Sequence, residues 1–200
     1  MDHLRYSGLP FEAQRAAFLD IVAADPLLAE TLARVRALAL PDWLLVSGAL
    51  YNSVWNHLAG KPSGYGIRDV DLLYFDESDL SYEAEDAVIR RAAQHFEGLA
   101  LPVEVRNQAR VHLWYEVRFG DTYPRLSSSA EALSCFASRT HAVGVHSGAD
   151  GPLELMAPFG LDDIFSFRIT PNKALDNRKT HEAKGARAKA NWPEITVVPW

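Results

Sequence analysis

Two aspartates, Asp69 and Asp71, lie one residue apart inside a segment that otherwise has the composition of a buried strand. Residues two apart on a strand point to the same face, so we expect both carboxylates to emerge on one side of the strand predicted over 70–75. Like charges held at this spacing raise each other's proton affinity unless a cation lies between them. A hard divalent ion such as Mg2+ takes oxygen ligands. The pair therefore predicts half of a metal site that needs a third ligand.

The composition is that of an ordinary globular protein and argues against several other classes. The chain has 200 residues, of which 48% are hydrophobic and 23% are charged, and these proportions argue against extended disorder. A single cysteine, Cys135, excludes an internal disulfide and favours a reducing compartment. No apolar run approaches the ~20 residues of a membrane span, and the N-terminus lacks the regions of a signal peptide. We therefore expect a cytoplasmic protein with no membrane partner.

The charge balance bears on partners. The net charge of −6 argues against a large basic surface for nucleic acid, although a local patch stays open. A basic helix is predicted over 180–190, and we expect its cationic side chains to form a solvated face, with a nucleic-acid patch as the alternative. The oligomeric state is not determined by any feature of the sequence.

Apolar spacing predicts a mixture of helices and short strands. Helices are expected over 11–24, 27–40, 49–58, 81–98 and 180–190, with a shorter helix begun by serines over 127–137. Strands are expected over 43–46, 70–75, 101–106 and 141–145, and apolar segments over 153–156 and 164–169 complete the elements. The segment 111–119 fits either helix or strand. This mixture is typical of the α/β or α+β class.

Glu104 is the candidate for the third ligand. It lies between Val103 and Val105 in a short β-branched segment, and alternation places it on the face opposite to the two valines. If this strand pairs beside the strand over 70–75, Glu104 falls next to the two aspartates. Three carboxylates could then hold one or two divalent ions, with substrate phosphates in the open positions.

A second candidate feature precedes the aspartates. Ser47, Gly48 and Ala49 follow an apolar run and open a helical pattern, so we predict a strand-turn-helix junction. Glycine lets the backbone approach a phosphate, and the helix N-terminus supplies unpaired N–H groups and a favourable dipole. A phosphate cradle beside a carboxylate metal site indicates phosphoryl or nucleotidyl transfer.

With these motifs in this order, the chain resembles the nucleotidyltransferase superfamily that includes DNA polymerase beta and the aminoglycoside nucleotidyltransferases. More closely, it is similar to a group of small bacterial nucleotidyltransferase-like proteins of unknown function. The matching stretches are residues 48–52, 69–75, 106–114, 157–163 and 171–172. The resemblance implies a small mixed sheet flanked by helices. It also implies one domain over 1–200, made of N-terminal helices (1–40), a catalytic core (41–120) and a C-terminal α+β extension (121–200).

The resemblance also implies roles for individual residues. Asp69, Asp71 and Glu104 would ligate two Mg2+ ions, or Mn2+ in their place, and Glu104 is the candidate acceptor of the proton from the substrate hydroxyl. Ser47, Gly48 and Ala49 would hold the triphosphate of an NTP, whose nucleoside monophosphate passes to an unknown acceptor. Two further candidates for contacting the nucleotide are Asn52, one turn into the helix, and Arg68, beside the aspartates. A local cap for Asn52 and an ion pair for Arg68 are the alternatives.

Two departures from the superfamily pattern keep other functions open. Ala49 stands where Ser or Gly is usual, which removes a hydroxyl, and Ser47 could replace it from the other side of the turn. Gly48 and Asp69 are 21 residues apart, and the surplus over 60–68 is either a cover for the triphosphate or a solvated loop. These departures favour a catalytically inactive nucleotide-binding or protein-interaction module. A glycosyltransferase is the second alternative, because it also uses Asp-x-Asp to hold a metal and a sugar nucleotide.

Overall fold

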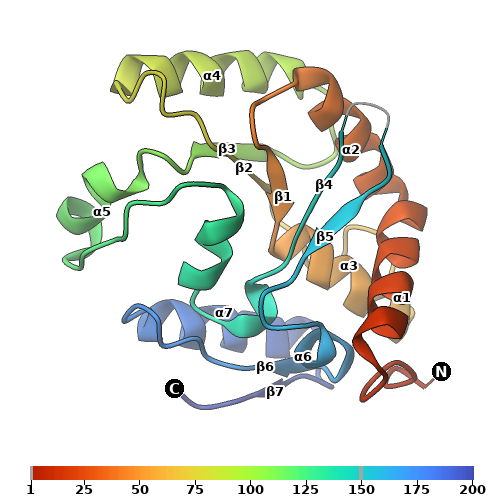
Figure 1. The fold of residues 1–200 in the computed structure, drawn as a ribbon. Coiled ribbons are helices and arrows are strands. Elements are labelled where there is room, and N and C mark those ends of the chain that lie inside the picture. The colour runs from red at the N-terminus through yellow and green to blue at the C-terminus, as the bar shows by residue number, and fades with distance from the viewer. Residues whose placement is uncertain (1, 149–150) are drawn as a thin grey trace.

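The structure is a computed structural model that describes residues 2–148 and 151–200. Its helices surround one central sheet (Figure 1). The α-helices are α1 (Phe11–Ala24), α2 (Pro26–Leu38), α3 (Gly48–Ala59), α4 (Tyr82–His95), α5 (Val111–Phe119), α6 (Asp162–Phe165) and α7 (Arg178–Asn191). Two 3-10 helices, η1 (Ala130–Cys135) and η2 (Arg139–His141), complete the helical elements of the described residues.

The central sheet is mixed, which confirms the predicted fold class. Within the described residues it has five strands in the order β3-β2-β1-β4-β5. The strands are β1 (Leu44–Val46), β2 (Val70–Tyr74), β3 (Val103–Asn107), β4 (Gly144–His146) and β5 (Glu154–Met156). Only β2 and β3 run parallel, and the other neighbours are antiparallel. A separate parallel pair joins β6 (Arg168–Ile169) to β7 (Thr196–Val197).

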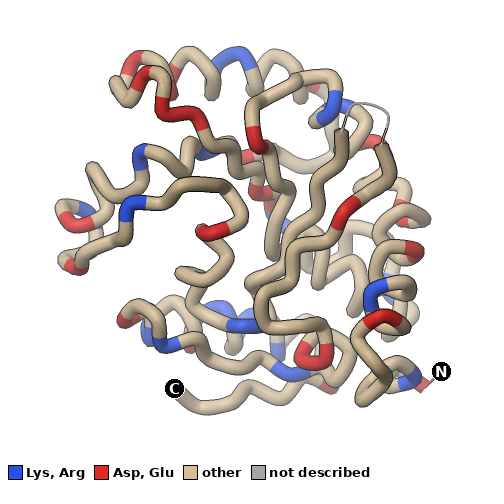
Figure 2. The backbone as a smooth tube through the Cα atoms, in the orientation of Figure 1, with Lys and Arg blue, Asp and Glu red and all other residues tan. Residues whose placement is uncertain are grey.

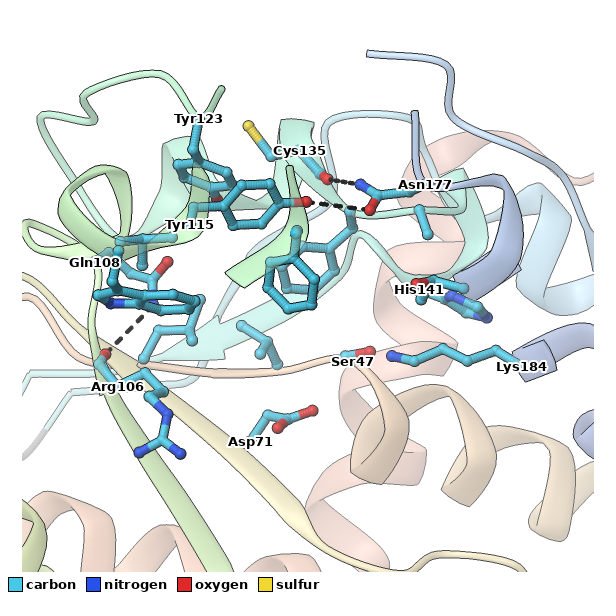
Figure 3. A pocket seen from close by; sticks show the side chains of 18 residues that line it. Ser47, Asp71, Arg106, Gln108, Tyr115, Tyr123, Cys135, His141, Asn177 and Lys184 are labelled. Carbon is cyan, nitrogen blue, oxygen red and sulfur yellow. Dashed lines mark hydrogen bonds between the residues drawn. The ribbon is translucent and has the colours of Figure 1, made fainter. Parts of the chain in front are cut away.

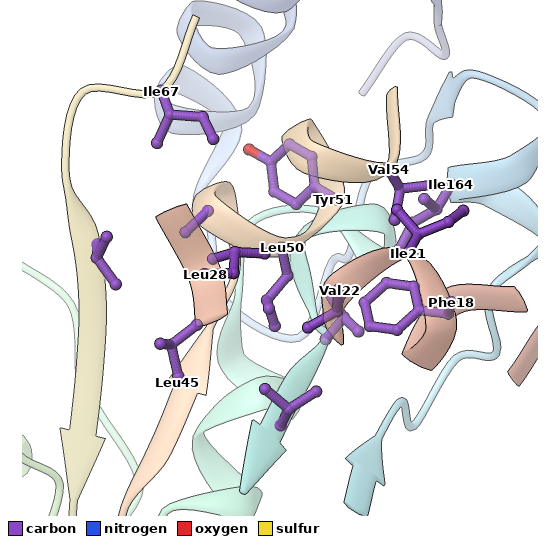
Figure 4. Packing of buried hydrophobic residues seen from close by; sticks show 14 of the residues in the cluster. Phe18, Ile21, Val22, Leu28, Leu45, Leu50, Tyr51, Val54, Ile67 and Ile164 are labelled. Atoms are coloured by element: carbon purple, nitrogen blue, oxygen red, sulfur yellow. The ribbon is translucent and has the colours of Figure 1, made fainter. Parts of the chain in front are cut away.

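Alternation along the strands divides the buried residues between the two faces of the sheet. Leu45 and Leu72 point into the main core, which they share with α1, α2 and α3. Figure 4 shows part of this core, in which Phe18 lies beside Val22 and Leu50 lies between them and Leu45. The opposite face carries a smaller cluster made by Leu44, Val46 and Leu73 with residues of the segment 126–142; this cluster lies on the face that holds the candidate site.

Several predicted elements are confirmed, and the structure shows why they form. Asp25 caps α2, because its carboxylate accepts hydrogen bonds from the backbone N–H groups of Leu27 and Leu28, and Pro26 occupies the first turn. The ambiguous segment 111–119 is the helix α5.

Other local predictions were wrong. The helix after the serines of 127–129 is the short 3-10 helix η1; its N-cap residue Ser129 makes no side-chain cap hydrogen bond, although the Ser128 hydroxyl accepts one from the Glu131 N–H at 3.3 Å. The strand expected over 141–145 begins only at Gly144, because His141 belongs to η2. At the start of α6, Asp162 accepts hydrogen bonds from the Gly8 N–H and the Gln14 amide, which ties the N-terminal segment to this helix.

Gly144 begins β4 and is paired with Val46 of β1, and it has no room for a side chain. A Cβ at this position would lie 2.8 Å from Leu44 Cγ and 2.9 Å from its Cδ2. We predict that Gly144→Ala lowers the free energy of unfolding by about 1–3 kcal/mol, the usual cost of overpacking a core. Urea denaturation measures this change. The double variant Gly144→Ala/Leu44→Val should recover part of the loss, and an unaltered midpoint in the single variant would contradict the prediction.

No helix among the described residues is long and apolar enough to cross a membrane.

Candidate active site

The predicted carboxylates share one face of the sheet. The register places Val46 opposite Asp71 and Asp71 opposite Glu104. Asp69 precedes β2 by one residue and lies two residues before Asp71, so it faces the same side. The two strands pair, which was the condition set for Glu104 in the sequence, and their parallel register brings Glu104 beside Asp71.

Asp71 is the most perturbed carboxylate of this group. Burial raises its pKa from the usual value to about 6. The charges of Asp69 and Glu104 raise the pKa further, whereas Lys184 and Arg106 oppose the rise. This balance shows that the three carboxylates and two cations lie within electrostatic reach of one another. A bound cation would favour the ionised form of Asp71 in the same way.

The three carboxylates are of the ligand type that a hard divalent ion prefers, but their side chains are not gathered around one point. Among residues 2–148 and 151–200, no three His, Cys, Asp or Glu side chains are grouped closely enough to hold a metal ion. The Glu104 side chain is 56% exposed and lies 4.0 Å from the Arg106 guanidinium. The carboxylate oxygens of Asp69 and Asp71 are the ligand type that Mg2+ prefers. Binding an ion between them and Glu104 would require rotation of these side chains.

Ser47 forms the sharp turn between β1 and α3. Its backbone has φ of 60° and ψ of −122°, a conformation that glycine adopts readily and that other residues adopt only under constraint. The Ser47 N–H donates a hydrogen bond to the carbonyl of Val143, the residue before β4, at 2.9 Å, and this bond holds the turn in place. The hydroxyl is buried, with the residue 2% exposed, and it has no hydrogen-bond partner in the described part of the chain. The turn thus holds a hydroxyl ready for a ligand at the start of α3.

The other residues predicted to contact the nucleotide differ in how far they are buried. Gly48 begins α3, and a Cβ there would meet only ordinary contacts. Ala49 is fully buried in the main core, so the departure at this position removes no hydroxyl from the site. Asn52 is buried one turn further along α3, and its Oδ1 has no partner among the described residues. Arg68 is exposed. Ser47 alone of these residues lines the pocket beside Asp71.

The surplus loop over 60–68 packs away from this pocket. Tyr65 donates a hydrogen bond to the Asn191 carbonyl, and its ring lies edge-on to Trp192. Lys61 lies over the Tyr65 ring rather than beside the carboxylates.

The C-terminal helix supplies a residue that the sequence analysis assigned to a solvated face. His181 and Ala188 are buried, and Lys184 lies between them on the same side of α7. His181 anchors the helix, because its ring nitrogens make hydrogen bonds with the Ser138 hydroxyl at 2.7 Å and the Val198 carbonyl at 2.8 Å. Figure 3 shows the Lys184 side chain directed toward Ser47. The buried residues His181, Gly185 and Ala188 define this side of α7, and their burial follows from tertiary packing rather than from a pattern in the sequence.

His141 lies behind Ser47 and is also unpartnered. It is 1% exposed, its ring stacks on Tyr51 at 5.0 Å, and neither ring nitrogen has a hydrogen-bond partner among the described residues. Burial holds its pKa well below the usual range, and the nearby cations Lys184 and Arg187 lower the pKa further. The ring is therefore neutral, so one nitrogen can donate a hydrogen bond and the other can accept one.

These groups line one central pocket with a volume of about 320 Å3 (Figure 3). Its polar end is made by Ser47, Asp71, His141 and Lys184. The remaining lining residues are Val46, Leu73, Arg106, Gln108, Val111, Trp114, Tyr115, Phe119, Tyr123, Cys135, Phe136, Ala137, Asn177 and Thr180. A strained turn at a helix N-terminus, Asp71 and a lysine thus meet beside an apolar space, whereas Asp69 and Glu104 do not line this pocket.

Comparison with known proteins identifies the family to which this arrangement belongs. The sequence model of a nucleotidyltransferase family matches residues 33–197. The chain belongs to this nucleotidyltransferase family. The resemblance drawn from the sequence motifs is therefore confirmed, and family and fold together support nucleotidyl transfer as the general activity.

A solved structure supports the fold of this nucleotidyltransferase. A protein studied by NMR, described as revealing a CCA-adding enzyme head domain, superimposes with a TM-score of 0.75. The alignment covers 92% of this chain and 96% of the other, with 24% sequence identity, so the likeness concerns the fold. Comparison with curated protein sequences gave no match.

Proposed function

We propose that this nucleotidyltransferase moves a nucleoside monophosphate from an NTP to an acceptor hydroxyl, with Mg2+ or Mn2+ held by Asp69, Asp71 and Glu104. The observation that carries the proposal is the row of carboxylates across β2 and β3, beside the pocket that begins at the Ser47 turn. Bound divalent ions would neutralise the charge on the phosphoryl oxygens and orient the reacting groups.

The chain's own residues have separate tasks in this reaction. The N–H groups at the start of α3, the Ser47 hydroxyl and the Lys184 ammonium group hold the β- and γ-phosphates. The acceptor oxygen attacks the α-phosphorus, the bond to the β-phosphate breaks, and pyrophosphate leaves in line with the attack. Glu104 accepts the hydroxyl proton, since its carboxylate faces solvent on the strand beside Asp71. Neutral His141 lines the polar end of the pocket beside Ser47 and adds no charge to the cradle.

Lys184 gives a sharp test of the phosphate cradle. We predict that Lys184→Met weakens the binding of Mg·ATP about ten- to hundredfold, because a charge-assisted hydrogen bond contributes roughly 1.5–3 kcal/mol. Binding of adenosine should not change, and Lys184→Arg should retain part of the ATP affinity. Isothermal titration calorimetry measures all three.

Lys179→Met is the matched control, because Lys179 is exposed on the same helix and does not line the central pocket. Equal ATP affinity in the Lys184→Met and Lys179→Met variants would show that the lysine does not bind phosphate.

A catalytically inactive module is the second candidate, and the pairing of Glu104 with Arg106 favours it. In such a protein Arg106 would keep Glu104 away from the aspartates, and nucleotide binding would be independent of metal. In an inactive module, ATP binding should become dependent on metal only after Arg106 is replaced by Gln. In an active enzyme, ATP binding should already depend on metal in the unmodified protein. No observation among the described residues favours the glycosyltransferase alternative.

A further inference from the structure

The central pocket continues beyond Asp71 into an open space lined by aromatic rings. We call this part the aromatic chamber; Trp114, Tyr115, Phe119, Tyr123 and Phe136 line it. The Tyr115 ring lies 4.7 Å from the Tyr123 ring and 4.7 Å from the Phe119 ring, so the walls are packed against each other. The phosphate cradle and the carboxylates do not use this space.

Two of the polar side chains that line the pocket here, Tyr115 and Asn177, are already paired with each other. The Tyr115 hydroxyl donates to Asn177 Oδ1 at 3.2 Å, and Asn177 Nδ2 donates to the Cys135 carbonyl at 3.2 Å. Burial raises the pKa of the Tyr123 hydroxyl, which stays protonated. A ligand with several hydrogen-bonding groups would leave them unpaired here, at a cost of about 1–3 kcal/mol for each group. The chamber therefore favours a flat, uncharged, mainly apolar body.

The direction of the reaction places the acceptor in this chamber. In-line displacement requires the attacking oxygen and the leaving pyrophosphate to lie on opposite sides of the α-phosphorus. In Figure 3, Ser47 and Lys184 lie on one side of Asp71, while Arg106 and Gln108 lie on the other. The chamber opens on the side of Gln108, beside the strand that carries Glu104. An acceptor bound there approaches the α-phosphorus from the side opposite to the cradle.

Size and charge disfavour a nucleic-acid strand as this acceptor. The whole central pocket, its polar end included, has a volume of about 320 Å3, which is at the lower end of small-molecule sites, so the chamber has room for no more than one ring system with a short arm. A phosphate backbone also needs several free cations along its path. On this side Arg110 pairs with buried Glu85, and Arg106 lies near Glu104. Figure 2 shows acidic residues beside basic ones around α5, whereas basic residues gather along α7.

We propose that the aromatic chamber binds the acceptor, and that the acceptor is a small uncharged molecule with an aromatic or aliphatic ring and a hydroxyl group. This inference rests on the proposed nucleotidyl transfer. The hydroxyl oxygen forms a bond to the α-phosphorus, the bond to pyrophosphate breaks, and the proton passes to Glu104. The product is the nucleoside monophosphate ester of the small alcohol.

The test uses naphthylmethanol, an uncharged aryl alcohol, as the probe. Calorimetry measures its binding to the full chain in the presence of Mg2+ and a nonhydrolysable ATP analogue, and the analogue is also titrated alone. We expect Trp114→Ala and Tyr123→Ala each to weaken probe binding about tenfold or more. Affinity for the ATP analogue should stay within about twofold. Val117→Ala is the control, because Val117 is 92% exposed on α5 and lies outside the chamber; neither affinity should change.

Three results would overturn the proposal. The first is absence of probe binding to the unmodified protein. The second is an equal loss of affinity for the probe and the ATP analogue in the chamber variants, which would place the nucleobase in the chamber. The third is displacement of the probe by a single-stranded RNA, together with nucleotide transfer to that RNA when ATP replaces the analogue. Failure of the proposed function is seen separately, as absence of binding of the ATP analogue to the unmodified protein.

Discussion

Replacing Asp71 with Asn is expected to make the protein more stable while it removes nucleotidyl transfer. The carboxylate lies at the centre of the site, between Val46 and Glu104 in the sheet. Loss of a group that stabilises the transition state electrostatically lowers the rate roughly a hundred- to a thousandfold. Release of pyrophosphate from an NTP in the presence of Mg2+ measures this loss.

The gain in stability follows from the raised pKa of Asp71. Burial raises this pKa to about 6, above its value in the unfolded chain. The protonated carboxyl therefore contributes stability that is complete at low pH and is lost as the pH rises through about 6. At pH 8 the buried charge costs at most about 3 kcal/mol, because a tenfold change in proton affinity corresponds to about 1.4 kcal/mol. Asn carries no charge and avoids this cost.

Thermal unfolding at pH 4 and pH 8, in the presence of EDTA, measures the effect. The Asp71→Asn variant should match the unmodified protein most closely at pH 4 and unfold at a higher temperature at pH 8. Asp76→Asn is a control of opposite sign, because hydrogen bonds from Ser78 lower the pKa of Asp76. An Asp71→Asn variant that is less stable at pH 8 would show that the carboxylate does not carry a buried charge.

The largest loss of stability is expected from breaking the buried pair of Glu85 and Arg110. Both side chains are buried, and the Glu85 carboxylate also accepts a hydrogen bond from the Asn107 N–H at 2.9 Å. Glu85→Ala leaves the Arg110 guanidinium buried without its counter-charge, which typically costs about 3–5 kcal/mol. Because this pair joins α4 to the end of β3 and the start of α5, its loss should also weaken binding in the aromatic chamber. Urea denaturation and probe titration measure the two effects.

A double variant separates the buried charge from lost packing. In Glu85→Leu/Arg110→Met both charges are replaced by apolar groups of similar volume, a change that is often close to neutral. We expect this variant to recover most of the stability lost in Glu85→Ala, apart from the hydrogen bond to Asn107. If the double variant were as unstable as Glu85→Ala, the loss would come from packing alone.

The sequence predicted the centre of the site because strand alternation and strand pairing are local rules. Alternation placed Asp69 and Asp71 on one face, and a helix between two strands made the parallel partner carrying Glu104 predictable. The predicted junction of strand, turn and helix is present at Ser47, and this residue lines the pocket. The significance given to Ala49 was not supported, because its side chain lies in the core.

The rest of the site depends on contacts between distant segments, which sequence patterns do not reveal. Lys184 reaches Asp71 only because His181 fixes α7 against Ser138 and Val198. The aromatic chamber is built where α5 and the segment after it meet the start of α7. The segment 111–119 was ambiguous because its apolar residues fit both periodicities, and its burial is decided by these long-range contacts. Basic residues on a helix usually face solvent, and only tertiary packing shows which of them turns inward.

Metal-dependent nucleotide binding at Asp69 and Asp71 is the property on which the proposed reaction depends. Calorimetric titration of ATP, CTP, GTP and UTP, each with and without Mg2+, into the unmodified protein and the Asp71→Asn variant measures it. We predict that at least one NTP binds more tightly with Mg2+ than without it, and that this enhancement disappears in Asp71→Asn. Equal affinity with and without Mg2+, or an unchanged enhancement in Asp71→Asn, would contradict the proposed role of the two aspartates.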